Sequence, residues 1–362
     1  MPTQFVLYPI QRIARDLNHG GPDDDHFDDS ILPLATIEGA TIEDISSLIR
    51  DGEFDDLKGH LSDDSIKLLQ RIKYAIVHRA EDFEDNGNGR YTLARDLLTR
   101  SQNIVAEIAA CLRLIRPTSQ RTQMYSGAIT QDGKFSTKVL NHPLTFVASP
   151  ENQSLFTIST QDIRDLLIYA PLFRAAMHGP YWKFRMAVQM HEAGHFQNTD
   201  WKARYFLWTS ALESLFTSNP TIGRKQHSGS LVASERIMDH LGRNTSIYPP
   251  RELTSLQADP GVTVQDVIND LYCLRNHIAH GDKVPDYYSE PTVRVGQMGP
   301  LSRADMLMEA ISFIVRRSLL KILRDGLLNH FQEGPSSEAY FTDKGLTLKQ
   351  LPRPLQYHNC RG

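Results

Sequence analysis

Cysteine, net charge and long apolar runs are all scarce in this chain of 362 residues. The three cysteines, Cys111, Cys273 and Cys360, lie far apart and form no Cys-x-x-Cys pair, which favours a reduced, cytoplasmic setting over a secreted one. The N-terminal apolar run is interrupted by Pro9 and is too short for a signal peptide. No apolar run is long enough to span a bilayer, so we expect a soluble protein without a membrane partner.

A strong charge of either sign is absent too, because the formal net charge is -4. No whole-chain basic field therefore attracts nucleic acid, and any contact with RNA or DNA has to come from a local patch. Apolar residues make up 40% of the chain and charged residues 23%, which is typical of a globular protein with a substantial core.

The hydrophobic pattern predicts a mainly α protein in three regions. Residues 1–160 are expected to form a helical region with a small antiparallel β insert, and its role as a sensor or regulator is an expectation by analogy. Residues 161–332 are expected to form a helical bundle. Residues 333–362, with Pro352 and Pro354 near their end, are expected to form an extended tail.

Two stretches support the N-terminal prediction. The stretch "SIKLLQRIKYAIVHRAEDFED" (65–85) reads as a helix with one apolar side, made by Ile66, Leu69, Ile72, Ile76 and His78. Between about 120 and 160, β-rich runs with an Asp-Gly turn signal predict the antiparallel insert.

The bundle is predicted from apolar stripes at helical spacing. Helices are expected over 229–242, from Thr263 to Gly281, and over 303–324, with Thr263 and Asp266 as a capping pair and Gly281 as a left-handed C-terminal cap. An earlier helix carries an apolar stripe that we expect to pack in the core, formed by Trp201, Tyr205, Trp208, Leu212, Leu215 and Phe216.

The first candidate site is "LYCLRNHIAHGDK", from Leu271 to Lys283. Five residues turn a helix by about 500°, so Arg275 and His280 lie roughly 140° apart around its axis. They share a site only near the helix end, or where a second copy supplies the complement across a symmetric dimer. As a bare pattern Arg-x4-His has little specificity, and "RPLQYH" (353–358) in the tail matches it as well.

Together with "FLWTSALESLF" (206–216), this stretch resembles the HEPN superfamily, especially its abortive-infection, Apea-like branch, over roughly residues 181–330. The resemblance implies an all-α bundle that pairs as a homodimer and a metal-independent endoribonuclease that needs no cofactor. It extends to toxins and phage-defence effectors that a trigger or a regulatory protein holds in check.

The resemblance also implies residue roles. RNA carries its own nucleophile, the 2′-OH, so His280 would exchange the proton, and Arg275 would bind the phosphate oxygens. Asn276 would orient the phosphate or ribose, Glu213 of the "ALE" turn would hold Arg275, and His277 is a weaker proton-transfer candidate. The cations nearest to the RNA would be Lys283, Arg224 and Lys225.

An alternative interpretation needs no RNA: His280 then only caps the helix C-terminus, and Arg275 pairs with an acidic neighbour.

The second candidate is "MHEAGHF" (190–196), which spells the zinc-peptidase motif His-Glu-x-x-His. His191 and His195 lie one helical turn apart, and Glu192 is placed to activate a zinc-bound water. Glu213 is the obvious third ligand, but the spacing of one peptidase group demands Ser214 instead, and one residue rotates a helical side chain by about 100°. Three classes of function thus stay open: the ribonuclease, a zinc metallopeptidase, and a non-catalytic dimeric module that binds RNA or a protein partner.

Overall fold

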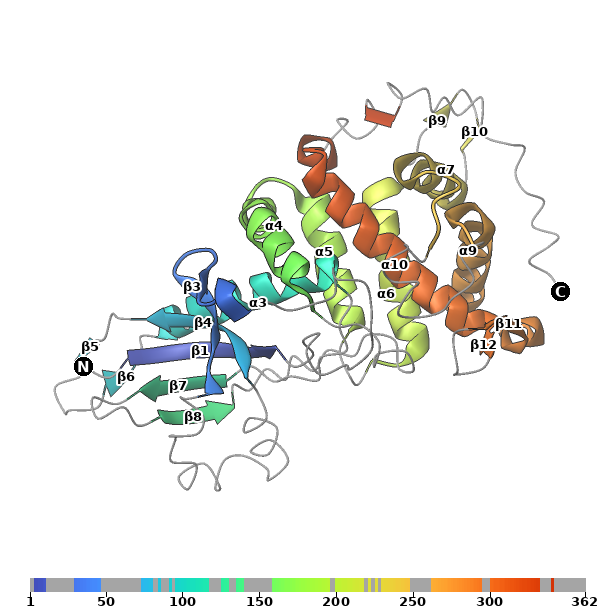
Figure 1. The fold of residues 1–362 in the computed structure, drawn as a ribbon. Coiled ribbons are helices and arrows are strands. Elements are labelled where there is room, and N and C mark those ends of the chain that lie inside the picture. The colour runs from blue at the N-terminus through green and yellow to red at the C-terminus, as the bar shows by residue number, and fades with distance from the viewer. Residues whose placement is uncertain are drawn as a thin grey trace. The chain divides into compact units, whose positions relative to one another are not determined.

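The computed structural model (Figure 1) describes residues 3–10, 29–46, 73–80, 84–85, 91–92, 95–116, 125–129, 135–139, 158–195, 199–217, 221–222, 225–226, 229–247, 262–294, 300–332 and 340–341. It is mainly helical with antiparallel β structure, as expected. The chain divides into two compact units, residues 1–148 with 156–173 and residues 149–155 with 174–362. The division falls inside helix α4 (Thr160–His178), and the expected boundary at residue 160 lies at the start of that helix.

The first unit contains an antiparallel six-stranded sheet with helix α3 (Arg95–Ile115) against its strands β1 and β4. The strand order is β2 (Leu34–Ala35), β3 (Ala40–Asp44), β4 (Tyr74–Ala80), β1 (Thr3–Ile10), β7 (Tyr125–Ile129), β8 (Phe135–Val139). Smaller described elements of this unit are the 3-10 turn η3 (Asp29–Ile31) and the strand pair β5 (Glu84–Asp85) and β6 (Tyr91–Thr92).

The helix expected over 65–85 is wrong in its described part. Residues 74–80 form β4, which pairs with β1 on one side and β3 on the other. Four consecutive residues, Tyr74 to Val77, are buried, although neighbours on a strand point to opposite faces. A strand covered on both faces reads as a continuous apolar run, which periodicity cannot distinguish from a helix. Residues 66–72 lie outside the described residues.

The expected β insert is present as the hairpin of β7 and β8. It does not stand alone, because β7 also pairs with β1, the first strand of the chain. The N-terminal region therefore carries more β structure, and in its described residues less helix, than the sequence predicted.

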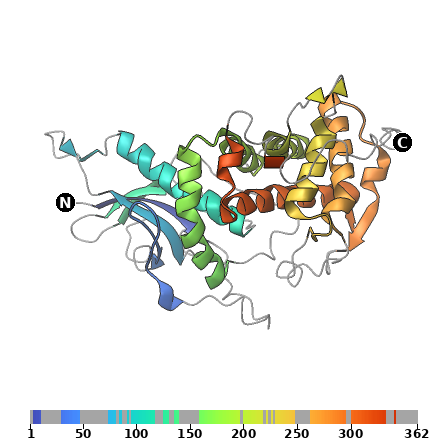
Figure 2. The same ribbon diagram turned by 90° about the horizontal axis from the view of Figure 1, so that it is seen from above.

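The second unit is a helical bundle (Figures 1 and 2). Its long helices are α5 (Trp182–Gly194), α6 (Trp201–Phe216), α7 (Gly229–Leu241), α9 (Val264–His280) and α10 (Arg303–Arg324). Helix α10 packs against the four others. Short elements lie between them: β9 (Thr221–Ile222), β10 (Lys225–Gln226), η5 (Asp286–Ser289), β11 (Pro291–Arg294) and β12 (Pro300–Ser302). The 3-10 turn η7 (Leu328–Phe331) follows α10.

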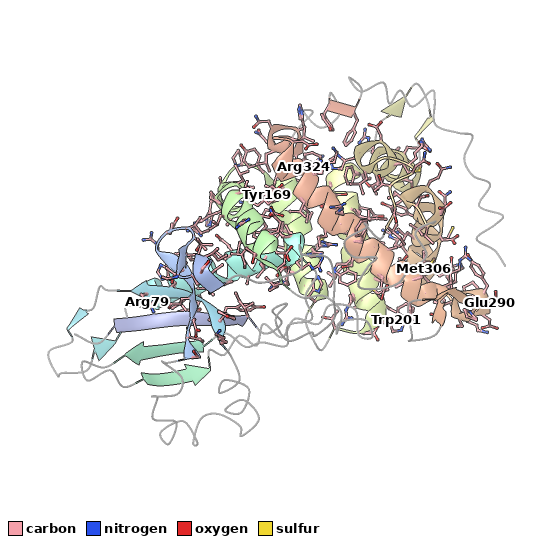
Figure 3. The ribbon with its side chains drawn as sticks, in the orientation of Figure 1. Arg79, Tyr169, Trp201, Glu290, Met306 and Arg324 are labelled. Carbon is pink, nitrogen blue, oxygen red and sulfur yellow. The ribbon has the colours of Figure 1, made fainter. Side chains whose placement is uncertain are left out.

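The expected apolar stripes form the core of the bundle. On α6, Tyr205, Trp208, Leu212, Leu215 and Phe216 are buried, but Trp201 at the first position is 39% exposed (Figure 3). The expected extended tail needs one correction. Tyr340 and Phe341 are helical and buried, and both pack against Phe331 of η7.

Within the described residues, none of the helices has the length and apolar character that a bilayer span requires. Cys111 of α3 is a buried free thiol, and burial raises its pKa. Cys273 of α9 is disulfide-bonded, so the expectation of reduced cysteines holds for Cys111 and not for Cys273. Cys360 lies outside the described residues.

Candidate functional site

Helix α9 is capped at both ends, and this defines where its last turn lies. Thr263 and Asp266 form the expected capping box, in which the Asp266 N–H donates to Thr263 Oγ1 at 3.4 Å and the Thr263 N–H donates to Asp266 Oδ2 at 2.8 Å. The Thr263 hydroxyl also donates to Asp266 Oδ2 at 2.6 Å, and this bond, together with the one from the Thr263 N–H, lowers the pKa of the Asp266 carboxyl. Gly281 ends the helix with a φ of 69°, a left-handed conformation that favours glycine. His280 is therefore the last helical residue.

One ion pair joins α9 to α6. Arg275 Nη2 donates to Glu213 Oε2 at 3.0 Å, and each of the two side chains is 23% exposed. Arg275 Nη1 donates to Asn276 Oδ1 at 3.3 Å. The Arg275 Nε–H is buried and has no hydrogen-bond partner. The guanidinium is thus held in place while part of it stays open to solvent.

Burial makes the charge of Glu213 costly. It raises the pKa of the Glu213 carboxyl, and the charge and hydrogen bond of Arg275 oppose this rise without cancelling it. The guanidinium therefore favours the ionised form of a carboxyl that burial disfavours.

Two side chains that the sequence had not singled out complete the surroundings of Arg275. Phe206 of α6 places its ring centroid 5.5 Å from Arg275 Cζ. Tyr272, one turn before Arg275 on α9, is 5% exposed and its hydroxyl has no hydrogen-bond partner. Burial raises the pKa of Tyr272, the charge of Glu213 raises it further, and Arg275 lowers it. Their spacing in the sequence could have pointed to them, because Phe206 is seven residues before Glu213 and Tyr272 is three residues before Arg275, and both spacings place residues on the same side of a helix.

The two histidines of the motif lie in different surroundings. His280 is exposed, and no hydrogen bond or ion pair between described residues joins it to Arg275. His277 is half-buried, with its ring 6.3 Å from that of Tyr288 in a T-shaped arrangement. One copy of the chain thus brings together Arg275, Asn276 and Glu213 and leaves His280 free to face another molecule.

The expected RNA-binding cations are scattered in the chain. Lys283 is exposed and pairs with Asp286 at 3.3 Å, a surface ion pair of little energetic weight. Lys225 belongs to the short strand β10, and Arg224 lies outside the described residues, as does the second Arg-x4-His match at 353–358.

The histidines of "HEAGH" lie inside the bundle. His191 and His195 of α5 and its C-terminal cap are 1% and 4% exposed, and their Nε2 atoms lie 3.3 Å apart. Trp208 of α6 packs against both rings and donates from Nε1 to the carbonyl of His191 at 3.0 Å. A Cβ atom at Gly194 would lie 2.2 Å from Trp208 Nε1. The motif is therefore part of a close helix–helix contact.

These residues do not fit a peptidase zinc site. The distance between the two Nε2 atoms would by itself suit two ligands of a tetrahedral zinc, given Zn–N bonds of about 2.0–2.1 Å. The rest of the site does not. A third ligand is missing, because no group of three potential ligands occurs in the part of the chain that the structure describes. Neither of the third ligands considered from the sequence is placed to bind with the histidines. Glu213 bonds to Arg275, and Ser214 Oγ bonds to the carbonyl of Lys183, which is about 12 Å along α5 from His191. A peptide substrate also has no access to side chains so deeply buried.

Comparisons with protein-family models, with curated proteins and with solved structures find no match for this chain.

Proposed function

We propose that this protein is a metal-independent endoribonuclease of the HEPN type that works as a homodimer. The observation that carries the proposal is the ion pair of Arg275 and Glu213 beside Asn276, because it presents a fixed, partly exposed guanidinium at the last turns of α9. The resemblance of residues 181–330 to HEPN proteins supports it, since the residues that the resemblance singles out include this pair.

The chemistry needs only proton transfer and neutralisation of charge. An imidazole of His280 takes the proton of the RNA 2′-OH, and the 2′ oxygen attacks the adjacent phosphorus. The P–O5′ bond breaks as the P–O2′ bond forms, and the imidazole, now protonated, gives that proton to the leaving 5′ oxygen. Arg275 binds the phosphate oxygens, whose charge increases in the transition state. The products are a 2′,3′-cyclic phosphate and a 5′-OH.

A second copy is part of the proposal for a geometric reason. Arg275 and His280 are about 140° apart around α9, so one copy does not direct both side chains at the same atom. His280 is exposed at the end of the helix, where a symmetry-related α9 could meet it. The toxin or defence role, a trigger, and a regulatory role for the first unit belong to the same proposal by analogy.

The test compares RNA cleavage by the wild type with that by Arg275→Ala and His280→Ala, with and without EDTA. We expect each variant to lose about 100-fold or more of the activity. Proton transfer by a positioned side chain contributes about 10²–10⁴-fold, and one donor that stabilises transition-state charge contributes about 10²–10³-fold. EDTA should leave the wild-type rate unchanged. Arg303→Ala is the matched control. Arg303 is another arginine that is paired with a carboxylate, because it bonds to Asp270 on α9, the helix that carries Arg275.

Two outcomes contradict the proposal. Wild-type protein that leaves RNA intact under conditions where it is folded and dimeric excludes catalysis and favours a binding module. Proteolysis of casein that EDTA and Glu192→Gln both abolish, together with stoichiometric zinc in the purified protein, would establish the peptidase instead.

A further inference from the structure

Phe206 is out of place for a large apolar residue of the bundle. It is 39% exposed, whereas Tyr205 and Trp208, its neighbours on α6, are fully buried. A single exposed apolar side chain needs no explanation by itself. The position of Phe206 does, because its ring lies against the guanidinium of Arg275, the group that we assign to the RNA phosphate.

The surface of α6 around Phe206 is polar and basic. Lys202 and Ser210 lie four residues before and after Phe206, so the three share one side of the helix. Lys202 is exposed and Ser210 is half-buried. Glu213, seven residues after Phe206, points in nearly the same direction and is neutralised by Arg275. The Phe206 ring thus lies beside the Arg275 guanidinium, and a second cation, Lys202, is one turn away on α6, with its Nζ 5.8 Å from the ring centroid of Trp201.

We propose that Phe206 stacks against a nucleobase of a single-stranded RNA segment whose phosphate Arg275 contacts, an inference that rests on the proposed function. Proteins that hold single strands combine positive charge along the backbone with aromatic rings on which bases stack. In a nucleotide the base and phosphate are joined through one sugar, so a ring and a guanidinium 5.5 Å apart can contact the two ends of the same unit.

A second copy of this chain is a poorer occupant of the strip. A stable dimer contact needs an apolar centre of several residues. The other exposed aromatic residue of α6, Trp201, is five residues from Phe206 and so lies about 140° around the helix. On its own side of α6, Phe206 has the small Ala203 as its exposed apolar neighbour, which is too little for an apolar centre, and its polar surroundings match a nucleic acid better.

The test measures binding without cleavage. A short single-stranded RNA with 2′-O-methyl groups lacks the nucleophile, and 2-aminopurine within it loses fluorescence when the base stacks. We expect Phe206→Leu to weaken binding about 10- to 100-fold and to restore the fluorescence, because base–aromatic stacking is worth about 1–3 kcal/mol. Phe206→Trp should bind within about 3-fold of the wild type, since it keeps a stacking face.

Trp201→Leu is the matched control, because it removes an equally exposed aromatic side chain from the same helix (Figure 3). It should leave the stacking fluorescence unchanged, because it keeps Phe206 and removes only the ring that contacts Lys202. Phe206→Leu with wild-type affinity overturns the inference, even if RNA cleavage is confirmed. Phe206→Leu that turns a dimer into a monomer in sedimentation also overturns it and assigns the strip to a second copy. Loss of stacking in a protein that never cleaves RNA would support the inference and refute the nuclease.

Discussion

At the scale of single residues, the site is a set of groups that depend on one another for charge and hydrogen bonding. Arg275 opposes the rise that burial causes in the pKa of Glu213, and Glu213 holds the guanidinium by a hydrogen bond at 3.0 Å. Beside them, the hydroxyl of Tyr272 and the Nε–H of Arg275 are buried donors without acceptors. Unsatisfied buried donors are rare in folded proteins because each has lost its bond to water.

Tyr272→Phe should therefore change the stability of the second unit by less than about 1 kcal/mol, since it removes a hydroxyl that forms no bond. Tyr205→Phe is the contrasting variant, because the Tyr205 hydroxyl donates to the carbonyl of Leu271 at 2.9 Å. It should cost about 1 kcal/mol or more. Urea unfolding followed by tryptophan fluorescence measures both, since all three tryptophans lie in this unit. A loss of about 2 kcal/mol in Tyr272→Phe would show instead that its hydroxyl has a partner, such as a bound water.

At the scale of elements, the ends of α9 determine which residues reach its last turn. The capping box begins the helix at Val264, and the left-handed Gly281 ends it directly after His280. The strength of the cap is open to measurement through the amide protons of the first turn, which fray when a cap is lost.

Thr263→Ala should destabilise the start of α9 by about 1 kcal/mol, because it removes the side-chain oxygen that accepts from the Asp266 N–H. Thr263→Ser keeps that oxygen and serves as the control. Hydrogen exchange of α9 peptides by mass spectrometry should show faster exchange in the first turn of Thr263→Ala alone. Equal protection in both variants would mean that packing, and not the cap, holds this end of the helix.

The elements also show how much of the fold could be predicted from the sequence. Helices α6, α9 and α10 were predictable, because each has a buried apolar stripe at helical spacing, and the bounds of α10 match the expected 303–324. Strand β4 was not, since burial on both faces removes the period on which the prediction depends. The bond between Glu213 and Arg275 was anticipated from the resemblance. Phe206 and Tyr272 were missed, because their significance depends on which side of α6 faces α9.

At the scale of the whole molecule, the proposed reaction needs two copies of the chain. Each copy supplies a guanidinium fixed by Glu213 and an exposed imidazole at the end of α9. A composite site of this kind has a consequence that a site within one chain does not, because two inactive variants then compensate for each other.

Co-expression of Arg275→Ala with His280→Ala should therefore restore RNA cleavage to a level well above that of either variant alone. Random pairing makes about half of the dimers mixed, and each mixed dimer keeps one guanidinium and one imidazole at the shared site. Cleavage of a fluorescently labelled RNA measures the recovery, and Arg275→Ala co-expressed with itself is the control. A mixture no more active than its parts would place the whole reaction within a single copy.

The contact of Gly194 with Trp208 bears on how "HEAGH" is interpreted in a sequence. Any side chain at position 194 would collide with the indole, and the indole is anchored by its bond to the carbonyl of His191. A glycine at position 194 thus leaves room for the indole, which packs against the rings of both histidines. The burial of both histidines therefore has to be considered before such a string is interpreted as a protease signature.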